Sequence, residues 1–242
     1  MPPQSLADLR FMRRALELAE LGLGETNPNP SVGCVLVKGG RVVGEGFHAR
    51  AGSPHAEVEA LRAAGARAKG TTAYVTLEPC APHPAKRTPP CAPSLIEAGV
   101  RRVVFGVPDA NRHVRGGGVR LLRAAGVVVE EGVCLEEATR LVQHFNIAMA
   151  RERPFVALKT GMTLDGRIAT ASGESKWITS SAQRAAASTL RRLFDGVLVG
   201  YETAREDDPM LLPEPRTERP FARVVLDTHL RLPRKHRLIQ TA

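Results

Sequence analysis

Three residues of the chain combine the side-chain types and spacing of a catalytic zinc centre: His55, Cys80 and Cys91. One imidazole and two thiolates leave the fourth position of a tetrahedral zinc ion open for water, as in catalytic rather than structural sites. Glu57 stands two residues after His55, where a general acid or base would be needed. These residues predict a zinc-dependent hydrolytic centre with three ligands, one Zn²⁺ per chain and Glu57 as the catalytic residue.

The charge of such a centre explains why a carboxyl group should lie beside it. Zinc with one neutral imidazole and two thiolates has no formal charge, so it acidifies water less than a site of three histidines would. Glu57 is then needed to take a proton from water and to deliver it to a departing amine. A His-x-Glu segment followed later by Pro-Cys is typical of the zinc deaminases, which hydrolyse aminopyrimidines in this way.

The elements that would position these residues alternate between helix and strand. Strands are expected over residues 32–37, 41–47, 71–77, 102–107 and 127–130, and helices over residues 6–21, 55–66, 92–98, 119–125 and 135–149. Ser53 and Pro54 are predicted to cap and start the helix that carries His55 and Glu57 in its first turn. Cys80 follows the end of a strand, where α/β sheets form their sites. The pattern predicts a three-layer α/β domain with a mixed sheet.

A change of pattern near residues 151–154, where charged residues and Pro154 interrupt the helix, predicts a domain boundary. A new strand is expected over residues 155–159. The predicted domains are therefore residues 1–150, with the zinc centre, and residues 151–242.

Composition limits the function classes. No apolar run approaches the roughly 20 residues that span a bilayer, and the N-terminal segment lacks the apolar core of a signal peptide. We therefore expect a soluble, cytoplasmic protein without a membrane partner. The net charge of +9 favours anionic partners such as phosphorylated small molecules or nucleic acid. An aromatic content of 4% argues against a stacking surface for single strands.

Two other functions are compatible with parts of the pattern. A structural zinc site in a non-catalytic chain would need a fourth protein ligand, which His48 or His83 could provide, and would leave Glu57 without a purpose. A deaminase that edits tRNA or other nucleic acid would fit the basic charge. Such enzymes typically have Pro-Cys-x-x-Cys spacing, whereas ten residues separate Cys80 from Cys91. We therefore expect no nucleic-acid partner.

Longer motifs resemble the cytidine deaminase superfamily and, within it, the bifunctional deaminase–reductase family of riboflavin biosynthesis. The motifs are Asn27-Pro28-Asn29-Pro30-x-Val32-Gly33, His55-Ala56-Glu57, Glu78-Pro79-Cys80, Arg87-Thr88-Pro89-Pro90-Cys91, Leu158 to Arg167, Ser172 to Ser180 and Asp207-Asp208-Pro209-x-Leu211. They follow the order of that family along essentially the whole chain.

The resemblance implies a cytidine deaminase-like domain with a mixed sheet, followed by a partial dihydrofolate reductase-like α/β domain. It implies deamination of 2,5-diamino-6-ribosylamino-4(3H)-pyrimidinone 5′-phosphate and then reduction of the ribosyl group to ribityl with NADPH. It also implies a homo-oligomer, either a dimer or a tetramer. The positions that match cofactor contacts are Gly161, Trp177, Thr203, Asp207 and Thr228, and those that match substrate contacts are Asn29, Ser175, Arg191 and Leu211. Arg191 is expected to pair with the substrate phosphate.

Three features depart from that family's pattern. The spacer between Cys80 and Cys91 is two residues longer than usual, with insertions near residues 82–85, and we expect metal binding to survive this change. After Leu211 the usual substrate-binding arginine is shifted or absent, and Arg216 is a candidate to substitute for it. The chain also stops at Ala242, so we expect an unfinished second sheet unless a partner chain completes it. From this we expect deaminase activity to be retained and reductase activity of this chain alone to be weak or absent.

Overall fold

The structure is a computed structural model that describes residues 5–84 and 89–242. It divides the chain into two compact units, Met1–Val156 and Ala157–Ala242. Ala85, Arg87 and Thr88, which belong to two of the sequence features above, lie outside the described residues. No described helix is both long and apolar enough to cross a bilayer.

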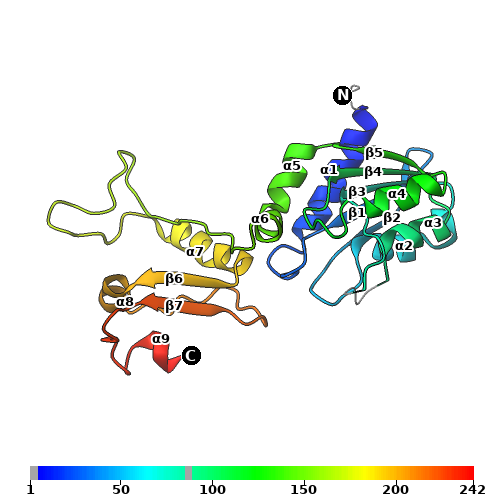
Figure 1. Cartoon of the computed structure of the whole chain (residues 1–242). Coiled ribbons are helices and arrows are strands. Elements are labelled where there is room, and N and C mark those ends of the chain that lie inside the picture. Colours follow the sequence, from blue (N-terminus) through cyan, green and yellow to red (C-terminus); the bar gives the residue numbers. More distant parts are fainter. Residues whose placement is uncertain (1–4, 85–88) are drawn as a thin grey trace. The chain divides into compact units, whose positions relative to one another are not determined.

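The first unit is built on a five-stranded mixed sheet with the order β2-β1-β3-β4-β5 (Figure 1). Its strands are β1 (Gly33–Lys38), β2 (Arg41–Phe47), β3 (Thr72–Leu77), β4 (Arg102–Val107) and β5 (Val128–Glu131). β1 pairs antiparallel with β2 and β3, whereas β3, β4 and β5 run parallel. The apolar strands β1, β3 and β4 are buried along nearly their whole length, as expected for strands covered on both faces. The predicted mixed sheet is confirmed.

Helices form the outer two layers. α1 (Leu6–Glu20) and α5 (Leu135–Leu141) contact each other and the middle of the sheet, whereas α2 (Ala56–Ala64), α3 (Cys91–Glu97) and α4 (Gly117–Ala124) form a second contacting group (Figure 1). A short 3₁₀ helix, η1 (Gly65–Ala68), follows α2. One continuous apolar core joins the sheet to both layers. The zinc motif lies at the start of α2, just after the end of β3 and at the start of α3.

The helix predicted over residues 135–149 is interrupted. α5 ends at Leu141 and α6 (Gln143–Arg151) follows, with Val142 between them at φ −104° and ψ 16°. Val142 is fully buried. Its β-branched side chain has a low helix propensity, and the residue at the interruption is part of the apolar core.

A buried ion pair connects α1 with the sheet. Arg102 donates from Nη1 to Asp8 Oδ1 at 2.7 Å and from Nη2 to Asp8 Oδ2 at 2.9 Å. The Tyr74 hydroxyl donates to the same carboxylate at 2.7 Å, and the Ser5 hydroxyl donates at 2.7 Å. Hydrogen bonds from Arg102 and these hydroxyls lower the pKa of Asp8 from 3.8 to about 2, against the opposing effect of burial. The carboxylate is therefore held in its charged form.

The second unit has a much smaller core. Its elements are α7 (Ser181–Leu190), η2 (Arg191–Leu193), β6 (Gly196–Gly200), α8 (Tyr201–Asp207), β7 (Ala222–Leu226) and α9 (Arg237–Gln240). β6 and β7 form a two-stranded parallel sheet, and the buried apolar residues of this unit are Ala204, Leu211 and Leu238. The strand predicted over residues 155–159 is wrong: this segment is neither helix nor strand, and Leu158 is 93% exposed. Among the described residues it has no strand neighbour, and a strand needs one.

Candidate metal centre

The three predicted ligands are placed by the ends of three elements. Cys80 follows β3, Cys91 is the first residue of α3, and His55 is the residue immediately before α2. The predicted cap of α2 is wrong: His55 occupies the N-cap position, and Ser53 instead donates its hydroxyl to the Arg50 carbonyl at 2.7 Å. His55 therefore has extended backbone geometry, with φ −73° and ψ 160°. This geometry lets its ring reach the two thiols.

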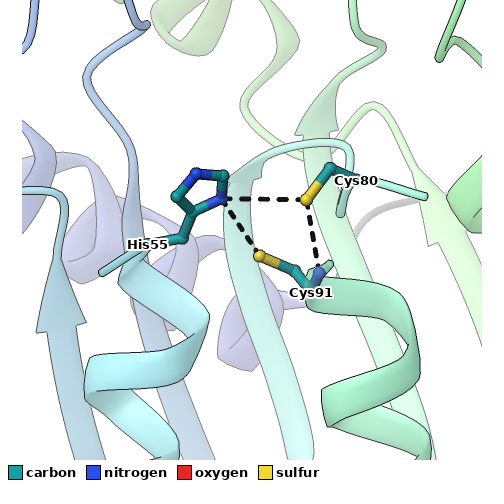
Figure 2. Close-up of side chains that lie close together, drawn as sticks. All are labelled: His55, Cys80 and Cys91. Atoms are coloured by element: carbon teal, nitrogen blue, oxygen red, sulfur yellow. Dashed lines mark hydrogen bonds between the residues drawn. The ribbon is translucent and has the colours of Figure 1, made fainter. Parts of the chain in front are cut away.

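The three donor atoms face one point (Figure 2). His55 Nδ1 lies 3.2 Å from Cys91 Sγ and 3.7 Å from Cys80 Sγ, and all three donor atoms are within 4.8 Å of one another. Tetrahedral zinc with its usual bond lengths separates a nitrogen from a sulfur ligand by about 3.6 Å. The peptide N–H of Cys91 also donates to Cys80 Sγ at 3.3 Å, which favours a thiolate at that position. The cluster fits a zinc ion, and the longer spacer still brings both thiols together.

No fourth protein ligand joins this cluster within residues 5–84 and 89–242. His48, one candidate for a fourth ligand, directs its two ring nitrogens to other partners, with Nδ1 at 3.0 Å from the Pro54 carbonyl oxygen and Nε2 at 3.2 Å from Asn29 Nδ2. His83 also lies outside the donor group. The described residues thus favour a site with an open coordination position over a closed structural one.

Glu57 lies in the first turn of α2 and is 4% exposed. Burial raises the pKa of its carboxyl group, and the nearby Cys80 raises it further, while His55 opposes this effect. A carboxyl group with a raised pKa exchanges protons more readily near neutral pH than an ordinary glutamate does. The position and environment of Glu57 suit the proton shuttle predicted from the sequence.

A pocket of about 630 Å³ opens at these residues. The side chains around it come from the Asn-Pro-Asn-Pro turn, the zinc motif and the segment after β4. They include Pro28, Asn29, Pro30, Val32, His48, His55, Glu57, Glu78, Cys80, His83, Asp109, Asn111, Val114 and Phe145. Its volume suits a small molecule. Asn29, predicted to contact substrate, lines this pocket.

Several lining residues were not predicted. Asp109 and Asn111 follow the end of β4, so the rule that α/β sheets bind ligands beyond their strand ends would have found them. His48 was considered only as a structural ligand, and Phe145 has no sequence signal that marks it. The hydrogen bond from Asn29 to His48 joins positions 19 residues apart, which sequence spacing alone does not reveal.

The segment after β4, which lines part of the pocket, is hydrogen-bonded to the segment that carries the zinc motif. The buried Glu78 accepts a hydrogen bond from the Asp109 N–H at 3.3 Å. Burial raises the pKa of Glu78, while peptide N–H groups of Asp109, Gly116 and Val119 oppose this effect. Gly118 of α4 lies so close to the motif that an added Cβ would be 1.7 Å from the Pro79 carbonyl oxygen. The chain segment that carries Cys80 therefore depends on its contact with α4.

Three of the residues that match cofactor positions follow the two parallel strands of the second unit. Thr203 and Asp207 are on α8, directly after β6, and Thr228 follows β7. The Trp177 ring is 73% exposed and has the Arg184 guanidinium 4.3 Å above it. Asp207 pairs with Lys176 at 3.3 Å. Gly161 lies in a segment without regular structure.

The residues that match substrate positions in the second unit are more scattered. Ser175 is exposed, and Leu211 is only 9% exposed within the small core. Arg191 donates from Nη1 to the Leu212 carbonyl at 3.1 Å and to Ser188 Oγ at 3.3 Å. Burial lowers the pKa of Arg191. Their contacts with substrate or cofactor stay predictions.

Comparison with known proteins identifies the family. The family model "Cytidine and deoxycytidylate deaminase zinc-binding region" matches residues 6–107, and "RibD C-terminal domain" matches residues 154–242. The riboflavin biosynthesis protein RibD of Escherichia coli is 46% identical over an alignment of 249 residues. The alignment covers 97% of this chain and 67% of that protein. The chain belongs to the RibD family. RibD of Aquifex aeolicus is 47% identical over 235 residues, covering 97% of this chain and 65% of its own length.

Solved RibD structures have the same fold. The chain superimposes on RibD of Acinetobacter baumannii with a TM-score of 0.87 and 47% identity, covering 97% of this chain and 67% of that one. A deaminase/reductase structure from Thermotoga maritima gives a TM-score of 0.87 and 43% identity, covering 96% and 66%. The predicted fold class, a cytidine deaminase-like domain followed by a dihydrofolate reductase-like one, is confirmed. The chain spans about two thirds of the length of these RibD relatives. The family match and the donor cluster together confirm zinc as a cofactor.

Proposed function

We propose that the first unit is a zinc-dependent deaminase of riboflavin biosynthesis, with 2,5-diamino-6-ribosylamino-4(3H)-pyrimidinone 5′-phosphate as substrate. The observation that carries the proposal is the convergence of His55, Cys80 and Cys91 beside the buried Glu57, at a pocket sized for a small molecule. The Thermotoga maritima relative, described as a diaminohydroxyphosphoribosylaminopyrimidine deaminase and 5-amino-6-(5-phosphoribosylamino)uracil reductase, supports the choice of substrate.

In this proposal, His55, Cys80 and Cys91 hold the metal. When bound, zinc supplies a Lewis acid that makes a water molecule a stronger nucleophile. Glu57 would take a proton from the attacking water and give it to a ring nitrogen of the pyrimidine, then take the remaining proton of the added hydroxyl and deliver it to the amino group, which leaves as ammonia. Its burial keeps bulk water from competing for the proton. Asn29 and the other polar groups of the pocket orient the aminopyrimidine for attack.

We propose that the second unit contributes to NADPH-dependent reduction of the ribosyl group. Thr203 and Thr228 follow the carboxyl ends of two neighbouring parallel strands, where α/β folds bind nucleotides. Gly161, Trp177 and Asp207 complete the proposed cofactor contacts, and Ser175, Arg191 and Leu211 the substrate contacts. We also propose a cytoplasmic homo-oligomer, a dimer or tetramer, that binds neither membranes nor nucleic acid. The spacing of Cys80 and Cys91 argues against an editing deaminase.

The direct test is to incubate the zinc-loaded protein with the pyrimidine phosphate, with and without NADPH, and to follow ammonia and NADPH separately. Ammonia release that does not require NADPH supports the deaminase. NADPH oxidation in step with the deaminated product would assign the reductase step to this chain as well. A zinc-loaded protein that releases no ammonia from this substrate would contradict the proposal.

Glu57→Gln separates catalysis from metal binding. We expect unchanged zinc content and a deamination rate lowered by about 10²- to 10⁴-fold, because the amide cannot shuttle protons. Glu59→Gln is the matched control, since Glu59 lies on the same helix and pairs with Arg62 at 2.7 Å. A Glu57→Gln protein with full activity would exclude Glu57 as the proton shuttle.

A further inference from the structure

His48 lines the pocket without being one of the proposed zinc ligands, and each of its ring nitrogens has a hydrogen-bond partner. Its side chain is buried, at 3% exposure, and its ring packs edge-on against His55 with centroids 5.3 Å apart. Each ring nitrogen has a partner that fixes which nitrogen carries the hydrogen. The inference below rests on the proposed deamination.

The partners on the Nδ1 side can only accept. The Pro54 carbonyl oxygen lies 3.0 Å from Nδ1 and has no hydrogen to give. Ser53 Oγ lies 3.5 Å from Nδ1, but its hydroxyl hydrogen already goes to the Arg50 carbonyl oxygen at 2.7 Å. Nδ1 must therefore carry the hydrogen.

This tautomer determines how Asn29 is oriented. A neutral imidazole has one donor and one acceptor nitrogen, so Nε2 of His48 is the acceptor. The group 3.2 Å from it must be the Asn29 amide NH₂, which is how the structure places it. The opposite amide orientation would bring a carbonyl oxygen and a ring lone pair together.

We infer that His48 is a positioning residue that fixes the orientation of the Asn29 amide, so that Asn29 presents its side-chain oxygen to the substrate. Asn29 lines the pocket, and the bond to His48 uses one N–H of its amide and turns the amide oxygen away from the imidazole. The substrate group that Asn29 recognises is then a donor, such as an amino or ring N–H or a hydroxyl. Hydrogen bonds from His48 to Pro54 and from Asn29 to His48 thus set the amide orientation with which the pocket recognises an amino group of the pyrimidine.

Two variants separate this positioning role from a simple packing role. The amide oxygen of a glutamine can occupy the position of Nε2, so His48→Gln should retain an acceptor for Asn29. An asparagine reaches only the position of Nδ1, so His48→Asn should retain the bond to Pro54 and lose the one to Asn29. We expect His48→Gln to keep KM for the pyrimidine phosphate near that of the unmodified protein. His48→Asn should raise KM roughly tenfold, the effect of one lost hydrogen bond, with a smaller change in kcat and unchanged zinc content. Equal KM values for the two variants would overturn the inference.

A second measurement does not depend on activity. Long-range ¹H–¹⁵N NMR spectra of the zinc-loaded protein should show His48 as a neutral ring with its hydrogen on Nδ1. A hydrogen on Nε2 would overturn the inference even if the protein deaminates its substrate. If no ammonia is released but the Nδ1 tautomer is found, the proposed reaction fails and the orientation of Asn29 stands.

Discussion

The contact between Gly118 and the Pro79 carbonyl offers a stringent test of how the zinc site is supported. In Gly118→Ala the new Cβ would lie 1.7 Å from the Pro79 carbonyl oxygen, whereas real Cβ atoms essentially never approach within 3.0 Å. The two segments must therefore separate by at least about 1.3 Å, the difference between these distances. Overpacking of this kind costs roughly 1–3 kcal/mol of stability.

The displaced residue is the neighbour of the ligand Cys80, so the effect should reach the metal. A shift of about 1 Å in a catalytic group can cost about 100-fold in rate. We expect Gly118→Ala to lower kcat/KM for deamination by about that factor and to bind zinc more weakly, as measured by competition with a chromogenic chelator.

Arg120→Ala is the control, because Arg120 is an exposed residue of the same helix. It should leave both zinc affinity and activity near those of the unmodified protein. A Gly118→Ala protein with normal zinc affinity and normal activity would refute the idea that α4 positions the Cys80 segment.

Three further predictions concern stability and ligands. Because the pKa of Asp8 falls from 3.8 to about 2 on folding, the ionised carboxylate contributes about 2 kcal/mol. This contribution is fully present above pH 5 and is lost as pH falls towards 2. Urea unfolding should therefore be less pH-dependent in this range for Asp8→Asn than for the unmodified protein, and an identical slope would contradict the assignment. Cys91→Ala should lose stoichiometric zinc in elemental analysis, and the melting temperature of the unmodified protein, but not of this variant, should fall when a chelator removes the metal. Trp177→Ala should weaken NADPH binding in a fluorescence titration while leaving ammonia release unchanged, and normal NADPH affinity would exclude Trp177 from the cofactor site.

The features that the sequence predicts well are those encoded locally. β4 has the predicted bounds, and the strands of the β1–β2 hairpin agree to within one residue, because turn residues and apolar patterns lie within a few positions of one another. His55, Cys80 and Cys91 could be singled out because metal chemistry restricts which residue types can serve as ligands, and their role as ligands stays a prediction. Their convergence in space follows from the strand end and helix starts that carry them.

Features that depend on distant partners were missed. The ion pair of Asp8 with Arg102 joins residues 94 positions apart, and nothing near either residue marks it. The strand expected over residues 155–159 has the right residue types, yet a strand forms only where another strand can pair with it. The predicted cap of α2 at Ser53 was wrong because His55 occupies that position and the Ser53 hydroxyl is used within its own turn.

The unequal cores of the two units have a consequence for how the protein opens in solution. Strands β1, β3 and β4 lie in a continuous apolar core, whereas β6 and β7 are alternately exposed along their length over a few buried residues. Backbone amides exchange with solvent through local opening, and the free energy of opening follows the apolar surface that must be exposed. Deuterium uptake by β6 and β7 should therefore be complete while the strands around the zinc ligands are still protected. Slow exchange throughout β6 and β7 would mean that their amides are covered by contacts beyond those of these two strands.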